Sequence, residues 1–149
     1  MSFPQRLLQG YSDFLGTRLP EEQNRFRALS ESGQSPEIMV IGCCDSRVSP
    51  EVIFDARPGE LFVVRNVANL VPPYSPDGQA HGVSAALEFG VAALKVQHIV
   101  VLGHAQCGGV AAALDNSLVA GVPFIGAWID LLEPALSDYA VAEDTAVHS

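Results

Sequence analysis

The run Ile38-Met39-Val40-Ile41-Gly42 decides the fold that this sequence predicts. It shows no polar alternation, which is typical of a parallel strand covered on both faces. Cys43-Cys44-Asp45-Ser46-Arg47 follows at once and supplies two thiols, a carboxylate, a hydroxyl and a guanidinium. Packing alone does not explain that set of groups, so we expect chemistry where the strand ends.

A second apolar run ends in a similar way. His98–Leu102 is expected to be a buried strand, and it leads into Gly103-His104-Ala105-Gln106-Cys107-Gly108-Gly109. A further strand is expected at residues 61–65. Ligands bind beyond the carboxyl ends of strands in open parallel sheets, so we expect the two chemically rich stretches to meet there.

Apolar residues at helical spacing surround these strands. Strands that alternate with helices predict an α/β fold, with a mainly parallel sheet flanked by helices and an N-terminal helical arm. A proline-containing loop is expected over residues 66–78, and residues 140–149 carry little signal. The predicted helical segments are residues 3–15 (ended by Gly16), 21–29, 49–54 (a short turn), 80–94, a helix from about 110, and 124–139.

The composition predicts one domain, residues 1–149, that associates with copies of itself. Hydrophobic residues make up 48% of the chain and charged residues 17%. A mean hydropathy of +0.24 favours a buried subunit interface, hence a homo-oligomer. The net charge of −9 repels phosphate backbones and anionic lipid, so neither nucleic acid nor a membrane surface is an expected partner.

The cysteines indicate a reducing compartment. There are three, at positions 43, 44 and 107, whereas a secreted disulfide framework normally has an even number spread through loops. The first residues lack the apolar stretch of a signal peptide, and no segment has the ~18–20 apolar residues of a membrane span. The expected location is cytoplasmic.

A zinc site is the chemistry that these residue types favour. Zinc takes thiolate and imidazole ligands, and sites of the alcohol dehydrogenase type use two cysteines and one histidine and keep a position for water. Cys43, His104 and Cys107 would supply that set, although Cys44 competes with Cys43 because successive side chains at a strand end diverge. Taken singly, each residue also has an ordinary structural role: a small buried cysteine, or a loop ion pair.

Two motifs together carry a resemblance to a known family. Cys43-x-Asp45-Ser46-Arg47 with His104-x-x-Cys107-Gly108-Gly109 resembles the β-class carbonic anhydrases, in particular their plant-like branch. The similarity runs over about residues 34–114 and includes Arg65-Asn66-Val67-Ala68-Asn69 and His81-Gly82.

The resemblance implies reversible hydration of carbon dioxide to bicarbonate and a proton through a zinc-bound hydroxide, by a carbonic anhydrase (a lyase). It assigns one Zn²⁺ per chain to Cys43, His104 and Cys107, and leaves Cys44 as a filler. It makes Asp45 and Arg47 the catalytic pair, in which Arg47 holds Asp45. In a closed form at lower pH, Asp45 would itself become the fourth zinc ligand.

The resemblance also implies a substrate pocket for carbon dioxide and bicarbonate. Gln34 stands where the plant-like branch has a hydrogen-bonding glutamine, and Gly108 where a backbone segment lies against the site. Phe62 and Val67 match apolar wall positions. Phe89 falls where that branch usually carries a tyrosine, so a hydroxyl is missing at that edge.

Members of this family continue beyond the region that matches this chain, so a C-terminally truncated domain is expected. Three alternatives stay open from the residues. One is hydrolysis of a carbon dioxide analogue such as carbon disulfide or carbonyl sulfide. The others are a non-catalytic zinc or redox module, and a fragment that binds zinc without activity.

Overall fold

A computed structural model describes residues 2–137, without the side chains of residues 116 and 118. The chain divides into two compact units, residues 1–35 and 36–149. No helix within residues 2–137 is long and apolar enough to cross a membrane.

The N-terminal unit is a pair of helices, α1 (Gln5–Gly16) and α2 (Arg18–Ser32). The Phe14 ring meets the Phe26 ring edge-on, with the ring centroids 5.9 Å apart. The predicted end of the first helix at Gly16 is confirmed. The second helix begins three residues before the predicted start at 21, because Pro20 lies in its first turn, where the missing N–H costs no hydrogen bond.

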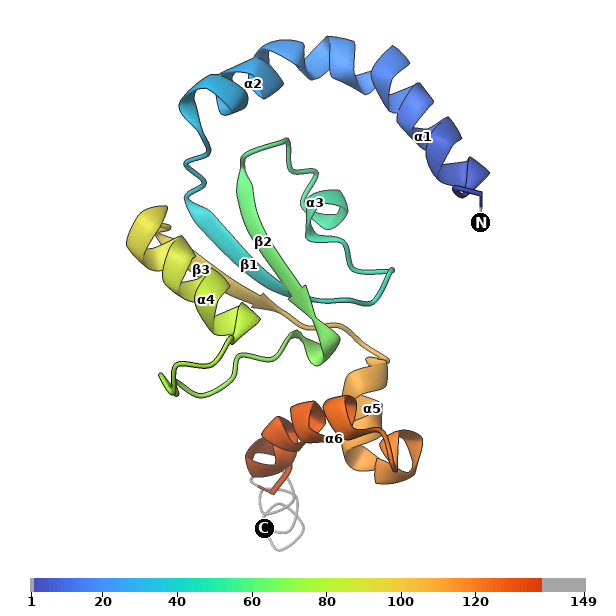
Figure 1. The fold of residues 1–149 in the computed structure, drawn as a ribbon, viewed down its shortest axis with the longest axis vertical. Helices are drawn as coiled ribbons and strands as arrows, with labels where there is room; N and C mark the ends of the chain where they lie inside the picture. The colour runs from blue at the N-terminus through green and yellow to red at the C-terminus, as the bar shows by residue number, and fades with distance from the viewer. Residues whose placement is uncertain (1, 138–149) are drawn as a thin grey trace, which may run out of the picture. The chain divides into compact units, whose positions relative to one another are not determined.

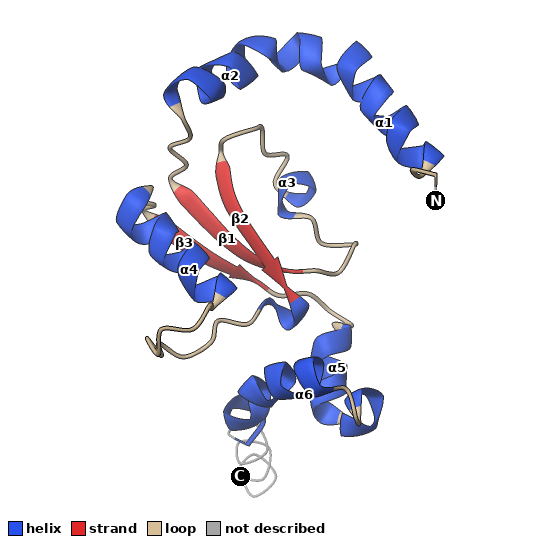
Figure 2. Ribbon diagram, viewed as in Figure 1, coloured by secondary structure: helices blue, strands red, loops and turns tan. Residues whose placement is uncertain are grey.

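The second unit is built on a parallel sheet of three strands in the order β2-β1-β3. The strands are β1 (Ile38–Cys43), β2 (Leu61–Asn66) and β3 (His98–Leu102), as Figures 1 and 2 show. All three predicted strands and their parallel pairing are confirmed, and β1 continues one residue further than predicted. That residue is Cys43, so a candidate ligand is itself part of the sheet.

Strand β1 is the centre of the core. Its Met39 side chain packs on one face toward Gly90, where an added Cβ would lie 3.0 Å from Met39 Sδ. On the other face, Pro50 of α3 (Pro50–Ile53) covers Gly42. The strand is therefore covered on both sides, as its uninterrupted apolar run predicts.

The prediction that His98–Leu102 is a buried strand is wrong for burial, although right for the strand. Val101 is 54% exposed, whereas Val40 on the central strand is 1% exposed. Within the described sheet β3 is an outer strand that pairs only with β1 and is left largely uncovered, whereas β2, the other outer strand, is half-buried. An apolar run indicates that burial of the strand is favourable, but the position of the strand in the fold decides whether other elements cover it.

Helices and short turns complete the second unit. The predicted helix over 80–94 is α4 (Gly82–Glu88) followed by a π-helical turn, η2 (Phe89–Ala93). The helix expected from about 110 begins two residues earlier, and the helix expected over 124–139 is broken into pieces; its last two residues lie outside the described part. The remaining elements are η1 (Val67–Asn69), α5 (Gly108–Leu114), η3 (Asn116–Val119), α6 (Pro123–Ile129), η4 (Asp130–Leu132) and a helical stretch over 133–137.

Two adjacent glycines at the start of α5 differ in the space beside them. A Cβ at Gly109 would lie 2.8 Å from Val67 Cγ1 and 2.9 Å from Ala68 Cβ, closer than carbon atoms tolerate. A Cβ at Gly108 would meet nothing within 4 Å. Gly109 therefore allows α5 to approach η1 closely, and Gly108 leaves open space.

Gly109→Ala is expected to lower the free energy of unfolding by about 1–3 kcal/mol, because the added methyl overpacks the contact with η1. Gly108→Ala is the matched control and is expected to change it by less than about 1 kcal/mol. Urea unfolding followed by circular dichroism measures both. Equal losses in the two variants would contradict the close approach at Gly109.

Candidate metal centre

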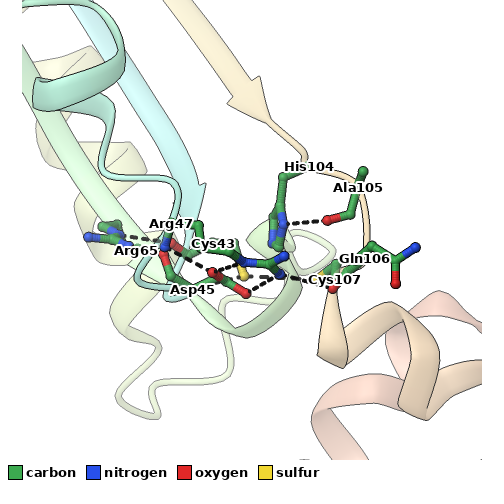
Figure 3. A network of polar contacts seen from close by, with 8 residues as sticks. All are labelled: Cys43, Asp45, Arg47, Arg65, His104, Ala105, Gln106 and Cys107. Carbon is green, nitrogen blue, oxygen red and sulfur yellow. Dashed lines mark hydrogen bonds and ion pairs between the residues drawn. The ribbon is translucent and has the colours of Figure 1, made fainter.

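Three potential metal ligands meet where β1 and β3 end. Cys43 is the last residue of β1, His104 follows β3 by two residues, and Cys107 caps the N-terminus of α5. Their ligand atoms all lie within 4.8 Å of one another, and the two sulfurs are 3.9 Å apart. Both thiols are buried, whereas Cys44 is exposed and lies outside the group. The strand ends thus converge as the sequence pattern predicts (Figure 3).

The turn between β3 and α5 aims two ligands at one place. Gln106 adopts a left-handed conformation with φ of 58°, which reverses the chain between His104 and Cys107. His104 Nδ1 lies 3.0 Å from the Ala105 carbonyl oxygen, and an N–H at Nδ1 would donate to it. That bond leaves the lone pair of Nε2 free for a metal.

The donor set fits zinc. His104 Nε2 is a buried nitrogen without a hydrogen-bond partner, an arrangement that costs stability unless something binds the atom. Two thiols and one imidazole match the ligand set of zinc sites that keep one position open for water or substrate. Within residues 2–137, this is the one cluster of three or more potential ligands.

Hydrogen bonds prepare Cys43 to act as a thiolate. Burial by itself disfavours the charged thiolate, but the backbone N–H of Asp45 donates to Cys43 Sγ at 3.4 Å. Further contributions come from His104 and from the backbone N–H of Ala68, and together they lower the pKa of Cys43 to about 7. Interaction with the Cys43 thiol in turn raises the pKa of His104.

Zinc affinity is expected to depend more steeply on pH below about 7 than above it. Below its pKa of about 7, Cys43 is protonated and must release that proton to bind metal. Its protonation therefore lowers zinc affinity by a further factor of at most about ten for each pH unit. The raised pKa of His104 adds proton competition of the same sign. Competition with a chelator of known pH dependence, from pH 6 to 8, measures this. A constant slope across that range would contradict the lowered pKa of Cys43.

An arginine holds the neighbouring carboxylate. Arg47 donates from Nε to Asp45 Oδ1 at 2.9 Å and from Nη2 to Asp45 Oδ2 at 2.7 Å, a bidentate pair. The Arg47 backbone N–H also donates to Oδ1 at 2.9 Å. These bonds hold the pKa of Asp45 well below its usual range, so Asp45 stays ionised. Both carboxylate oxygens point to Arg47, and Asp45 is not in the ligand group.

Several supporting contacts are not predicted from the sequence. Arg47 Nη2 also donates to the Gln106 carbonyl oxygen at 3.1 Å, which ties the two motifs together. Arg65 donates to two carbonyls of the Cys43–Asp45 segment. Trp128 Nε1 donates to the Val67 carbonyl at 2.8 Å. Two signals pointed to Arg65: it is an arginine in an otherwise apolar strand, and it belongs to a segment of the family resemblance. The other bonds depend on which backbone atoms lie close in space.

The residues predicted for the substrate pocket fall in different places. Val67 follows β2 directly and Gly108 begins α5, so both are at the metal end of the sheet. Phe62 and Phe89 contact each other instead, with ring centroids 5.9 Å apart. Phe62 is level with Met39, four residues before Cys43, which is about 13 Å along the strand. Gln34 belongs to the N-terminal unit, residues 1–35.

The fold is a parallel α/β fold, and two cysteines and one histidine lie at the carboxyl ends of its strands. This is the donor set of metalloproteins that bind zinc with one coordination position open. Residues 38–148 match the family model described as carbonic anhydrase. The chain belongs to the carbonic anhydrase family, and the relatives that it matches include β-class members.

Two curated relatives and one solved structure show the extent of the likeness. The chain is 37% identical to beta carbonic anhydrase 3 of Arabidopsis thaliana, covering 88% of this chain and 51% of the relative. It is 39% identical to a carbonic anhydrase of Pseudomonas aeruginosa, covering 87% and 57%. A tetrameric β-carbonic anhydrase of Sordaria macrospora matches with a TM-score of 0.78 at 35% identity, covering 95% and 68%. The chain thus spans about half the length of the curated relatives.

Proposed function

We propose that this protein catalyses the zinc-dependent, reversible hydration of carbon dioxide to bicarbonate and a proton. One observation carries the proposal: an open Cys-His-Cys ligand group stands beside a carboxylate that an arginine holds in a bidentate grip. A purely structural zinc site closes its coordination with a fourth ligand and has no use for such a pair. Membership of the carbonic anhydrase family supports the same activity.

Cys43, His104 and Cys107 would hold the metal, one ion per chain. Zinc bound there would supply a Lewis acid that lowers the pKa of a coordinated water to about 7. Asp45 is ionised at that pH and can only accept hydrogen bonds, so it would orient the attacking oxygen through that oxygen's proton. Arg47 would keep the acceptor in place. We propose that in a closed form Asp45 would leave Arg47 and serve as a fourth residue that holds the metal.

We propose that the substrate meets an apolar side chain at the metal end of the sheet. Val67 borders an open, largely apolar hollow of about 380 Å³, shared with Phe124, Ile125 and Trp128. Gly108 has no side chain, and the space beside its Cα is free. We propose that Val67 forms the apolar wall against which carbon dioxide lies, and that Gly108 lets the substrate approach the backbone.

We propose that the protein works as a homo-oligomer. The apolar faces on both units, including Leu7, Tyr11, Val52 and Val101, are exposed in a single chain. The related Sordaria macrospora enzyme is tetrameric. Phe62 is level with Met39, about 13 Å along the strand from Cys43, and Phe89 contacts Phe62, so we propose that a second copy brings this pair to the metal centre. Gln34 stays a proposed substrate contact.

The cysteines also bear on the cellular location of the protein. All three cysteines are unpaired thiols, and a thiolate metal site requires reduced cysteines, so we propose a cytoplasmic location. The net charge of −9 argues against nucleic acid and anionic membranes as partners. Membership of the carbonic anhydrase family supports carbon dioxide and bicarbonate as the small molecules that the metal centre would bind.

Stopped-flow carbon dioxide hydration on protein of known metal content tests the proposal. We expect hydration to rise in proportion to bound zinc and to disappear when a chelator removes it. Hydration no faster than buffer, with one zinc bound per chain, would reject the activity.

A further inference from the structure

Arg65 holds the backbone on which the metal centre is built. Its Nε donates to the Cys43 carbonyl oxygen at 2.8 Å, and its Nη2 donates to the Asp45 carbonyl oxygen at 2.6 Å (Figure 3). The planar guanidinium fixes the spacing of its donors, so one side chain sets two carbonyls relative to each other. One of these carbonyls belongs to a metal ligand and the other to the carboxylate residue.

The fold gives Arg65 a fixed path to these atoms. Arg65 on β2 is level with Gly42 on β1, and a Cβ at Gly42 would lie 3.9 Å from Arg65 Cγ. The half-buried side chain thus crosses the strand at a residue that has no side chain. The next residue, Asn66, accepts a hydrogen bond from the Cys44 backbone N–H at 2.9 Å. The end of β2 therefore contacts three consecutive residues, 43, 44 and 45.

We propose that Arg65 is a positioning residue for the hydration reaction: it holds the Cys43 and Asp45 carbonyls and so places the Asp45 carboxylate relative to the three metal ligands. The inference rests on the proposed function. Arg65 acts on the backbone of Asp45, whereas Arg47 acts on its carboxylate, so the two arginines fix different degrees of freedom of one residue.

Two substitutions separate positioning from folding. Arg65→Gln removes the positive charge and the planar guanidinium group with its fixed donors. Arg65→Lys keeps the charge and most of the aliphatic stem over Gly42, but a single ammonium group cannot reproduce the fixed spacing of the two donors. Arg27→Gln, on the exposed part of α2, is the control for the loss of one positive charge. Each variant of the 149-residue chain is loaded with Zn²⁺ for kinetics and with Co²⁺ for visible absorption.

Both Arg65 variants are expected to bind one metal per chain, because all three ligands remain. Their kcat is expected to fall about 10–100-fold, the usual effect of residues that orient a metal site from outside its ligands, with KM changed less than about threefold. The Co²⁺ absorption bands are expected to shift in both, because the surroundings of the metal change. Arg27→Gln is expected to match the unchanged protein in every measurement.

An unchanged Co²⁺ spectrum in Arg65→Lys at full loading would overturn the proposal. So would a lowered melting temperature with an unchanged spectrum, because Arg65 would then be only a structural support. If Arg65→Gln does not fold, the lysine variant decides. If the unchanged protein does not hydrate carbon dioxide, the proposed function fails. The Co²⁺ spectra would then still test whether Arg65 positions the residues around the metal.

Discussion

Cys43→Ala is expected to lower zinc affinity by about a hundredfold or more, and Cys44→Ala to leave it within about threefold. Zinc sites with four protein ligands bind with about 10–16 kcal/mol, or about 3 kcal/mol for each ligand, and every 1.4 kcal/mol is tenfold. Cys43 belongs to the buried ligand group, whereas Cys44 is exposed and outside it. The two residues are adjacent and identical, so each variant controls for the other.

Competition of each variant with a chelator, followed by metal analysis after dialysis, measures both affinities. Cys107→Ala is expected to behave like Cys43→Ala, because the two sulfurs lie 3.9 Å apart in the same group. Equal losses in the Cys43 and Cys44 variants, or full zinc loading in Cys107→Ala, would contradict this ligand set. Loss only in Cys44→Ala would exchange the roles of the two neighbouring thiols.

Asp45→Asn is expected to lower kcat for carbon dioxide hydration about a hundredfold or more while one zinc stays bound per chain. Positioned acid and base groups contribute about 10²–10⁴-fold to a rate. Asparagine is nearly the same size, but its NH₂ cannot accept a hydrogen bond from the attacking oxygen and would point a donor at Arg47. Zinc should remain because Asp45 is outside the ligand group.

Two further variants sharpen that measurement. Arg47→Lys is expected to give an intermediate loss, because an ammonium group keeps the charge but not the bidentate grip on Asp45. Asp55→Asn makes the same chemical change at an exposed position with a left-handed backbone, which asparagine adopts readily, and is expected to have no effect. Stopped-flow rates at equal zinc content compare them. A rate in Asp45→Asn within threefold of the unchanged protein would remove Asp45 from the mechanism.

The strands and the types of ligand were predictable because each depends on a short piece of chain. The apolar run at 38–42 predicts a strand without knowledge of the segments that pack against it, and that strand is confirmed. Helix boundaries were less certain. Nothing in the spacing of residues 80–94 predicts that the helix becomes a π-helical turn at Phe89. The buried Gly90 lies in that turn, where an added Cβ would be 3.0 Å from Met39 Sδ, and such a close approach between distant segments is not visible in local spacing.

The amino-acid pattern is sufficient to identify a parallel α/β protein whose strand ends carry two cysteines, a histidine and an Asp-x-Arg pair. Local patterns carry that information, since strand periodicity and ligand chemistry are properties of neighbouring residues. The tertiary structure alone decided which side chains share a space. It buries Cys43 and exposes Cys44, leaves β3 at an edge, and brings Arg65 to carbonyls about twenty positions away. Those outcomes depend on strand register and sheet order, which no single stretch of sequence contains.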